Sequence, residues 1–142
     1  MYLAAGQLVP SVTGKTWDDF VGERIFAPLG MKSTNTSTKK LAQMNDVATP
    51  HMVFNDKIKP IAWRNIDNIA PAGSINSNVN EMAQWLRMQL AMGKYDGKQI
   101  ISEVGIKNMW ASHSIIPLDG PGFGTFYPKA HFLNYGMGWF LS

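Results

Sequence analysis

Apolar residues follow helical spacing in the first part of the chain. Residues 1–12 are almost entirely apolar, and Gly14 offers a natural helix stop. Pro10 should damage such a helix, but Gly6 stands four residues earlier, where its missing side chain relieves some of the crowding. The pattern therefore predicts a first helix that is bent or shortened near Pro10.

A second, amphipathic helix is expected over the sequence TWDDFVGERIF, residues 16–26. Thr16 can cap it, and two aspartates follow in the first turn, at the positive end of the helix dipole. Pro28 and Gly30 should end the helix, and the polar stretch KSTNTSTKK at 32–40 indicates a loop with one short turn after it. The apolar positions of this helix are Trp17, Phe20, Val21 and Ile25.

The middle of the chain predicts a hairpin and then a long helix. Asn55-Asp56, a dipeptide typical of tight turns, is flanked by two groups of apolar residues: Met52, Val53 and Phe54 before it, and Ile58, Ile61 and Trp63 after it. In SNVNEMAQWLRMQLAMG, at 77–93, Ser77 or Asn78 can cap a helix, with Glu81 placed for a capping box and Gly93 as terminator. The side chains expected to be buried together on this helix are Met82, Trp85, Leu86 and Leu90.

The last third contains weaker signals. Ser102 should open a helix that runs to about Trp110. The following stretch, PLDGPGFGTFYP, is too rich in glycine and proline for regular structure. Gly120, Gly122 and Gly124 alternate in it, but a phosphate-binding loop needs a strand before it and a helix after it, and neither is predicted here. A flexible loop is therefore favoured. The final residues, NYGMGWFLS, indicate one strand weakened by two glycines. Mostly helices with short strands predict an α+β fold.

Composition narrows the possible functions. With 45% hydrophobic and 16% charged residues, the 142-residue chain can bury a core, so a disordered role is excluded. Its 13 Lys and Arg are scattered, and the aromatic residues lie inside apolar stretches, so no nucleic-acid partner is expected. No apolar run approaches the roughly 18 residues of a membrane span, and the first ten residues do not form a signal peptide.

Metal and thiol chemistry are not expected either. The chain has no cysteine, which excludes disulfides, thiolate ligands and cysteine nucleophiles. His51, His113 and His131 have no histidine or carboxylate at the helical spacing of a metal site. We therefore predict neither a metal nor a cofactor.

Three sequence blocks carry a resemblance to a known family. In order, they are VTGKTWDDFVGERIFAPLGMKST, NIAPAGSINSNVNEMAQWL and YGMGWF. The chain resembles serine beta-lactamase-like hydrolases, a family of class C beta-lactamases, D-Ala-D-Ala carboxypeptidases and related esterases. The resemblance implies an antiparallel sheet flanked by helices plus a helical region, with catalysis between them. Residues 1–142 would be a single partial domain, the helical region and its return strand, of a periplasmic or secreted protein.

The resemblance also implies that the catalytic residues lie elsewhere. The family uses a Ser-x-x-Lys, a Tyr-x-Asn and a Lys- or His-x-Gly, and no tyrosine here is followed at that spacing by asparagine. The family's Lys- or His-x-Gly strand ordinarily follows a segment like YGMGWF, and this chain ends at Ser142. We therefore expect an internal fragment that is inactive alone, and we assign no catalytic residue.

One literal Ser-x-x-Lys does occur, at Ser37-Thr38-Lys39-Lys40. A catalytic lysine needs a lowered pKa so that it can accept the serine proton. Lys40 lies in a polar run with neither apolar burial nor a neighbouring charge to lower its pKa. A solvated surface loop is the favoured interpretation.

The candidate substrate-lining residues are Gly73, Ser74 and Ser77. They belong to PAGSINSNVNEMAQWL, which resembles a family segment that forms a small-residue turn beside the substrate cleft. A tight turn and helix cap are the purely structural alternative. Ser74-Ile75-Asn76 also matches the Ser-x-Asn element of penicillin-binding relatives. Trp63 and Trp139 could shape a substrate pocket, but we expect them to be core residues.

Three functional hypotheses follow. The leading one is a piece of an acyl-transferring serine hydrolase that forms one wall of the cleft for a small-molecule or peptide substrate. The alternatives are a stand-alone binding or regulatory module descended from such an enzyme, and a minimal hydrolase that uses Ser37 and Lys40. Because residues 1–8 and 135–141 would expose apolar surface, we also expect a homo-oligomer, most simply a two-fold dimer.

Overall fold

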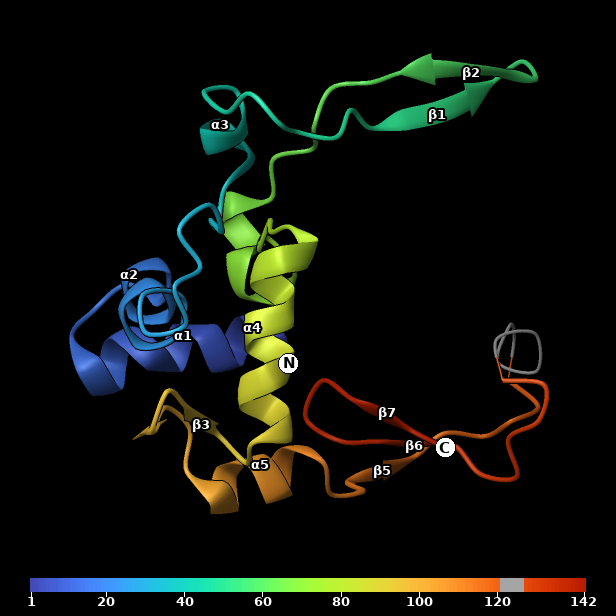
Figure 1. Cartoon of the computed structure of the whole chain (residues 1–142). Coiled ribbons are helices and arrows are strands. Elements are labelled where there is room, and N and C mark those ends of the chain that lie inside the picture. Colours follow the sequence, from blue (N-terminus) through green and yellow to red (C-terminus); the bar gives the residue numbers. More distant parts are fainter. Residues whose placement is uncertain (121–126) are drawn as a thin grey trace. The chain divides into compact units, whose positions relative to one another are not determined.

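The computed structural model describes residues 1–120 and 127–142 (Figure 1). Half of the predicted glycine-rich loop, including Gly122 and Gly124, lies outside the described residues. The chain divides into two compact units, Met1–Trp85 and Leu86–Ser142. Both contain helices and short antiparallel strands, which confirms the α+β prediction. The single partial domain stays a prediction.

The first unit opens with helix α1, Tyr2–Thr13. The helix continues through Pro10, so it is not shortened, and it ends at Gly14 in the left-handed conformation, as predicted. α1 packs against the 3₁₀ segment η2, Asp67–Ala72. Gly6 lies at this contact: a Cβ there would fall 2.1 Å from Pro71 Cγ. The glycine therefore serves the packing of α1 on η2 as well as tolerating Pro10.

The second predicted helix forms as two joined pieces. Thr16 caps α2, Trp17–Val21, by accepting a hydrogen bond from the Asp19 amide (3.1 Å). The chain then continues as a π-helical turn, η1, Gly22–Phe26. Because a π turn repeats every five residues instead of every four, Phe26 follows Val21 on the buried face. The core of this unit consists of Val21, Phe26, Leu29, Met31, Leu41 and Ala70.

A short helix and the predicted hairpin come next (Figure 1). Helix α3 spans Thr38–Leu41, so it begins inside the stretch, 32–40, that the sequence assigned to a loop. Strands β1, His51–Phe54, and β2, Lys57–Pro60, pair antiparallel around Asn55 and Asp56. Both turn residues have positive φ, 50° and 57°, as a two-residue hairpin turn requires.

Trp63, which follows the hairpin, is not a core residue. Its side chain is 38% exposed, and its Nε1 donates to the Ala48 carbonyl oxygen (3.1 Å). The core prediction for Trp63 is therefore wrong. The ring lines an open groove, so one part of it meets solvent although its nitrogen bonds a backbone carbonyl.

Helix α4, Val79–Leu90, begins where the sequence predicts but turns a different face inward. Asn78, rather than Ser77, is the cap, because its Oδ1 accepts from the Glu81 amide (3.0 Å). The residues with lower exposure are Glu81, Gln84, Trp85, Met88 and Gln89. This face repeats every three or four residues and shares only Trp85 with the predicted one. The predicted burial of Met82, Leu86 and Leu90 is wrong, since all three are exposed.

The second unit contains a small hairpin, one helix and a three-stranded sheet. Strands β3, Lys94–Tyr95, and β4, Lys98–Gln99, form the hairpin. Helix α5, Glu103–Met109, starts at Ser102, whose hydroxyl accepts from the Gly105 amide (3.0 Å), as predicted. The sheet has the order β5-β6-β7, with strands Ser114–Ile115, Asn134–Tyr135 and Phe140–Leu141.

The last nine residues form two strands, so the prediction of one weakened strand is wrong. The chain reverses between Gly136 and Trp139, where the Gly136 amide donates to the Trp139 carbonyl (2.8 Å). Trp139 is half-buried against Trp110, with ring centroids 6.4 Å apart, and Phe140 contacts Tyr135. The expectation that this segment lacks partners is therefore wrong: β6 pairs with both β5 and β7 within the same unit.

Candidate substrate-cleft wall

The predicted site residues lie between η2 and α4, in the first unit. The amides of Gly73 and Ser74 both donate to the Ala70 carbonyl (3.1 and 3.0 Å), which turns the chain away from η2. Ser74 is only 5% exposed, and its hydroxyl has no hydrogen-bond partner among the described residues. Gly73 is exposed, whereas Ser77 lines an open groove. Ser77 is therefore the candidate that faces a space for a ligand.

Asn76 joins this turn to a distant segment. Its amide donates to the Asn35 carbonyl (2.8 Å), and the Asn35 amide donates back to the Asn76 carbonyl (3.0 Å). The side-chain nitrogen of Asn76 donates to the Ser74 carbonyl (2.9 Å) and to Asn35 Oδ1 (3.3 Å). Both amide hydrogens are thus used within the protein. The Ser-x-Asn match at 74–76 acts here as a structural turn, with no donor left on Asn76 Nδ2 for a substrate.

Glu81 fastens the same two segments from the start of α4. One carboxylate oxygen accepts from the Ser33 amide (2.8 Å), and the other accepts from the Thr34 amide (2.8 Å) and hydroxyl (2.5 Å). The predicted capping box is therefore replaced by a long-range contact. Because the Thr34 hydroxyl spends its single hydrogen on Glu81, the Ser77 hydroxyl, 2.7 Å away, must donate to Thr34. The Ser77 oxygen keeps its remaining capacity as an acceptor.

These contacts fix the charge state of Glu81. Burial raises the pKa of its carboxyl group, but the hydrogen bonds from Thr34 and Ser33 outweigh this effect and hold the pKa below its ordinary value. Glu81 is consequently ionised at neutral pH. We refer to Glu81, Ser33, Thr34 and Ser77 as the Glu81 clamp.

An open groove of about 850 Å³ lies beside the clamp. The residues that line it are Ser33, Leu41, Met44, Asn45, Asp46, Val47, Ala48, Trp63, Ile75, Asn76, Ser77, Asn78, Val79, Asn80 and Glu81. Of the predicted site residues, only Ser77 belongs to this set. Thr34 and Asn35 hold the groove residues Glu81 and Asn76 in place, and this role had no signal in the sequence, because the partners lie 47 and 41 residues away along the chain.

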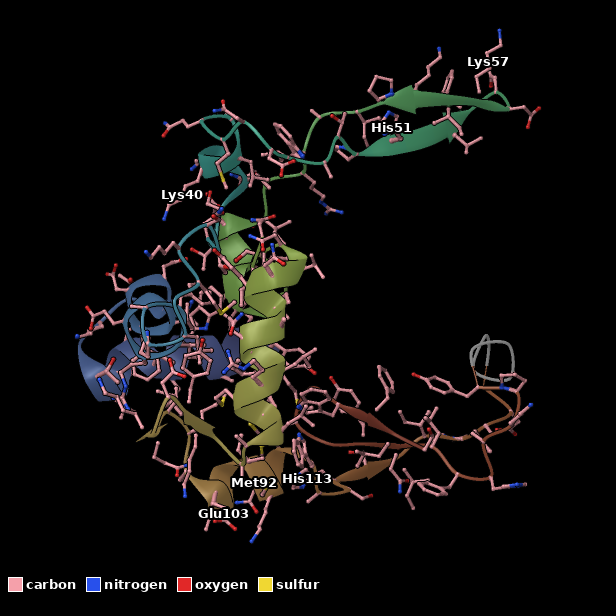
Figure 2. The ribbon with its side chains drawn as sticks, in the orientation of Figure 1. Lys40, His51, Lys57, Met92, Glu103 and His113 are labelled. Carbon is pink, nitrogen blue, oxygen red and sulfur yellow. The ribbon has the colours of Figure 1, made fainter. Side chains whose placement is uncertain are left out.

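Ser37 and Lys40 do not form a nucleophile and base. The Ser37 hydroxyl caps α3 by accepting from the Lys39 amide (3.2 Å), and Lys39 pairs with Asp67 (3.1 Å). Lys40 is exposed (Figure 2). Within the described residues, no group of three metal-ligating side chains could hold an ion, and no helix has the length and apolar character to cross a membrane.

The clamp leads to a prediction about acid stability. Replacing Glu81 with glutamine should reduce the free energy of unfolding at pH 7 by roughly 1–3 kcal/mol, because the Ser33 and Thr34 amides lose a charged acceptor. Since the folded-state pKa of Glu81 is lowered, its contribution is present above the unfolded pKa, 4.5, and is lost as pH falls through the folded value. Urea unfolding at pH 7 and pH 3 should therefore show a smaller pH dependence in Glu81→Gln.

The matched control is Glu23→Gln. Glu23 is exposed and pairs only with Lys15 among the described residues, so its replacement should change stability by less than about 1 kcal/mol. Equal losses for the two variants, or an unchanged pH dependence in Glu81→Gln, would contradict the clamp.

Comparison with known proteins identifies the family of the chain. The family model described as Beta-lactamase matches residues 1–142. An unguisins hydrolase of Aspergillus campestris is 25% identical over 85% of the chain, and penicillin-binding protein 4 of Amycolatopsis lactamdurans is 28% identical over 71%. The chain spans only 22% and 27% of the length of these relatives.

A solved structure has the same fold. The octameric penicillin-binding protein homologue from Pyrococcus abyssi superposes with a TM-score of 0.72 at 20% identity, over 99% of this chain and 28% of that one. At this identity the likeness concerns the fold. Together with the match of the family model to the whole sequence, it shows that the chain belongs to the beta-lactamase family.

Proposed function

We propose that this chain forms one wall of the substrate cleft in a beta-lactamase-type serine hydrolase. The observation that supports the proposal most is the groove at the start of α4, lined by Ser77, in a chain that matches the family model throughout. The names of the relatives, a hydrolase and a penicillin-binding protein, fit the same chemistry. Acyl transfer to water from a beta-lactam, peptide or ester is the proposed reaction.

In this proposal the chain binds and orients the substrate, and other parts of the parent protein supply the nucleophile and its base. The Glu81 clamp and the pairing of Asn35 with Asn76 hold both sides of the groove in place. A wall that is held before the substrate arrives lowers the entropic cost of positioning the reacting carbonyl. The proposed contribution of this chain to catalysis is therefore positioning.

The isolated chain should show no hydrolase activity. We expect no turnover of nitrocefin or p-nitrophenyl esters and no covalent adduct with penicillin, because Ser37 is engaged as a helix cap and Lys40 is exposed. Mass spectrometry after incubation with penicillin measures the adduct. The intact parent protein, treated in the same way, should gain the mass of one penicillin.

Two outcomes would contradict the proposal that this chain positions the substrate while other parts of the parent protein supply the catalytic residues. A stoichiometric adduct on the isolated chain that disappears in Ser37→Ala would make it a minimal hydrolase. A reading frame without a Ser-x-x-Lys upstream of this segment would favour a stand-alone binding or regulatory module.

The remaining proposals concern assembly and location. We propose that the chain forms homo-oligomers through α1, where Leu8 and Val12 are exposed; the similar archaeal structure is described as octameric. Light scattering that gave about the mass of one chain, 15.8 kDa, would contradict this. A periplasmic or secreted location is the matching proposal for the parent protein.

A further inference from the structure

The groove beside the Glu81 clamp has an unbalanced charge. Its charged lining residues are Asp46 and Glu81, and no lysine, arginine or histidine belongs to the lining. The Glu81 carboxylate is occupied by three hydrogen bonds from Ser33 and Thr34. Asp46, by contrast, is exposed and has no hydrogen bond or ion pair with any described residue. One unpaired carboxylate therefore faces ligands in this groove.

The uncharged polar groups on the groove reinforce this preference. The Ser77 hydroxyl donates to Thr34, so its oxygen can meet a ligand only as an acceptor. The Asn76 side-chain nitrogen is committed to Ser74 and Asn35. Two of the polar positions that could otherwise donate to an anionic ligand are thus unable to do so. Asn45, Asn78 and Asn80 also line the groove, so the discrimination between a ligand carboxylate and an amine rests on the negative charge of Asp46.

Several other lining residues are apolar. Ile75 and Val79 are exposed, and Met44 and Val47 are half-buried. Trp63 presents mainly its ring, because its only polar atom is bonded to the Ala48 carbonyl. An apolar surface with a few oriented polar groups is the usual composition of a site for a small organic ligand, and 850 Å³ lies within the usual range.

We propose that this groove selects amides that carry both an apolar side chain and an amine, and that Asp46 is the residue that sets the preference. The inference rests on the proposed function, since it names the class of substrate that the cleft wall accepts. Asp46 attracts the amine and repels carboxylates, and the apolar lining holds the side chain.

The test uses the 142-residue chain and three matched probes: N-acetyl-leucyl-lysine amide, N-acetyl-leucyl-norleucine amide and N-acetyl-leucyl-glutamate amide. Binding is followed by the shifts of backbone amide signals in nitrogen-15 NMR spectra. The lysine probe should bind about tenfold more tightly than the glutamate probe, with norleucine between them, as expected for one charge pair near a protein surface. The shifts should centre on residues 44–48 and 75–80.

Variants at Asp46 test whether this residue causes the preference for the lysine probe. Asp46→Asn should reduce the ratio of affinities for the lysine and glutamate probes to below about twofold, and Asp46→Lys should reverse it. The control, Asp56→Asn, makes the same charge change in the hairpin turn, outside the groove, where asparagine tolerates the left-handed backbone. It should leave the ratio unchanged.

Equal binding of the three probes, shifts confined to other residues, or a ratio that survives in Asp46→Asn would overturn the inference. Because the measurement involves no turnover, its failure leaves the hydrolase proposal standing. Conversely, a parent protein that fails to form an acyl-enzyme leaves the binding preference of the groove intact.

Discussion

Alanine at position 93 is expected to destabilise the second unit by about 2–5 kcal/mol. Gly93 ends α4 with φ of +84°, a conformation that costs a residue with a Cβ roughly 1–2 kcal/mol. The new Cβ would also lie 2.0 Å from the Ile101 carbonyl oxygen, a backbone atom that cannot rotate away. Relieving this overlap should add roughly 1–3 kcal/mol, because it disturbs the bonds from the Ile100 and Ile101 amides to the Gly93 carbonyl.

The matched control is Gly97→Ala in the same unit. Gly97 also has positive φ, +78°, but an added Cβ would meet no atom within 4 Å. This variant should therefore lose only the cost of placing a Cβ at positive φ, about 1–2 kcal/mol. Urea unfolding gives the free energies, and hydrogen exchange of the Ile100 and Ile101 amides locates the effect. Equal losses in the two variants would mean that the chain after α4 does not pass as close to Gly93 as the structure has it.

Gly6→Ala is expected to reduce the free energy of unfolding of the first unit by about 2–3 kcal/mol. The added Cβ would lie 2.1 Å from Pro71 Cγ and 2.3 Å from Pro71 Cβ. A proline ring has no rotamer that moves these atoms away, so α1 must shift from η2. The gain in helix propensity, about 1 kcal/mol, offsets only part of that cost.

Gly22→Ala should have the opposite sign. Gly22 is helical, with φ of −58°, and an added Cβ would meet nothing within 4 Å. Alanine should therefore stabilise the unit by up to about 1 kcal/mol. Urea midpoints that moved in the same direction for Gly6→Ala and Gly22→Ala would contradict the packing of α1 on η2.

Features that depend on neighbouring residues were predictable from the sequence. Thr16 and Ser102 cap helices where predicted, and Asn55-Asp56 forms the expected hairpin turn. Each of these features depends only on residues close together in the sequence. A cap forms because a side chain bonds a nearby backbone amide, and the hairpin turn forms because its two residues tolerate positive φ. The end of the chain was misread for a related reason. Gly136 and Gly138 were interpreted as weak points of one strand. Gly138 instead has the positive φ, 85°, at which the chain reverses, and Gly136 packs where a Cβ would lie 2.3 Å from the Met109 carbonyl oxygen.

The inward face of α4 and most of the groove were not predictable. Hydrophobicity selected Leu86 and Leu90, but Glu81 and Gln89 are among the less exposed residues instead. For Glu81 the reason is its bonds to Ser33 and Thr34, which lie 48 and 47 residues away. Nothing in the local pattern indicates that a charged residue will find such partners. The candidate Ser77 was identified through family resemblance, whereas Asp46 required the three-dimensional arrangement.

The pairing of Asn35 with Asn76 has a consequence for how this protein can diversify. It closes a loop, residues 36–75, that carries the hairpin and several of the residues lining the groove. The entropy of closing a loop grows only with the logarithm of its length, about 0.6 kcal/mol for each doubling. Insertions and deletions near the hairpin tip should therefore be inexpensive while the junction and the Glu81 clamp are kept. Related genes could acquire new ligands by exchanging this loop, with the helices beneath it inherited unchanged.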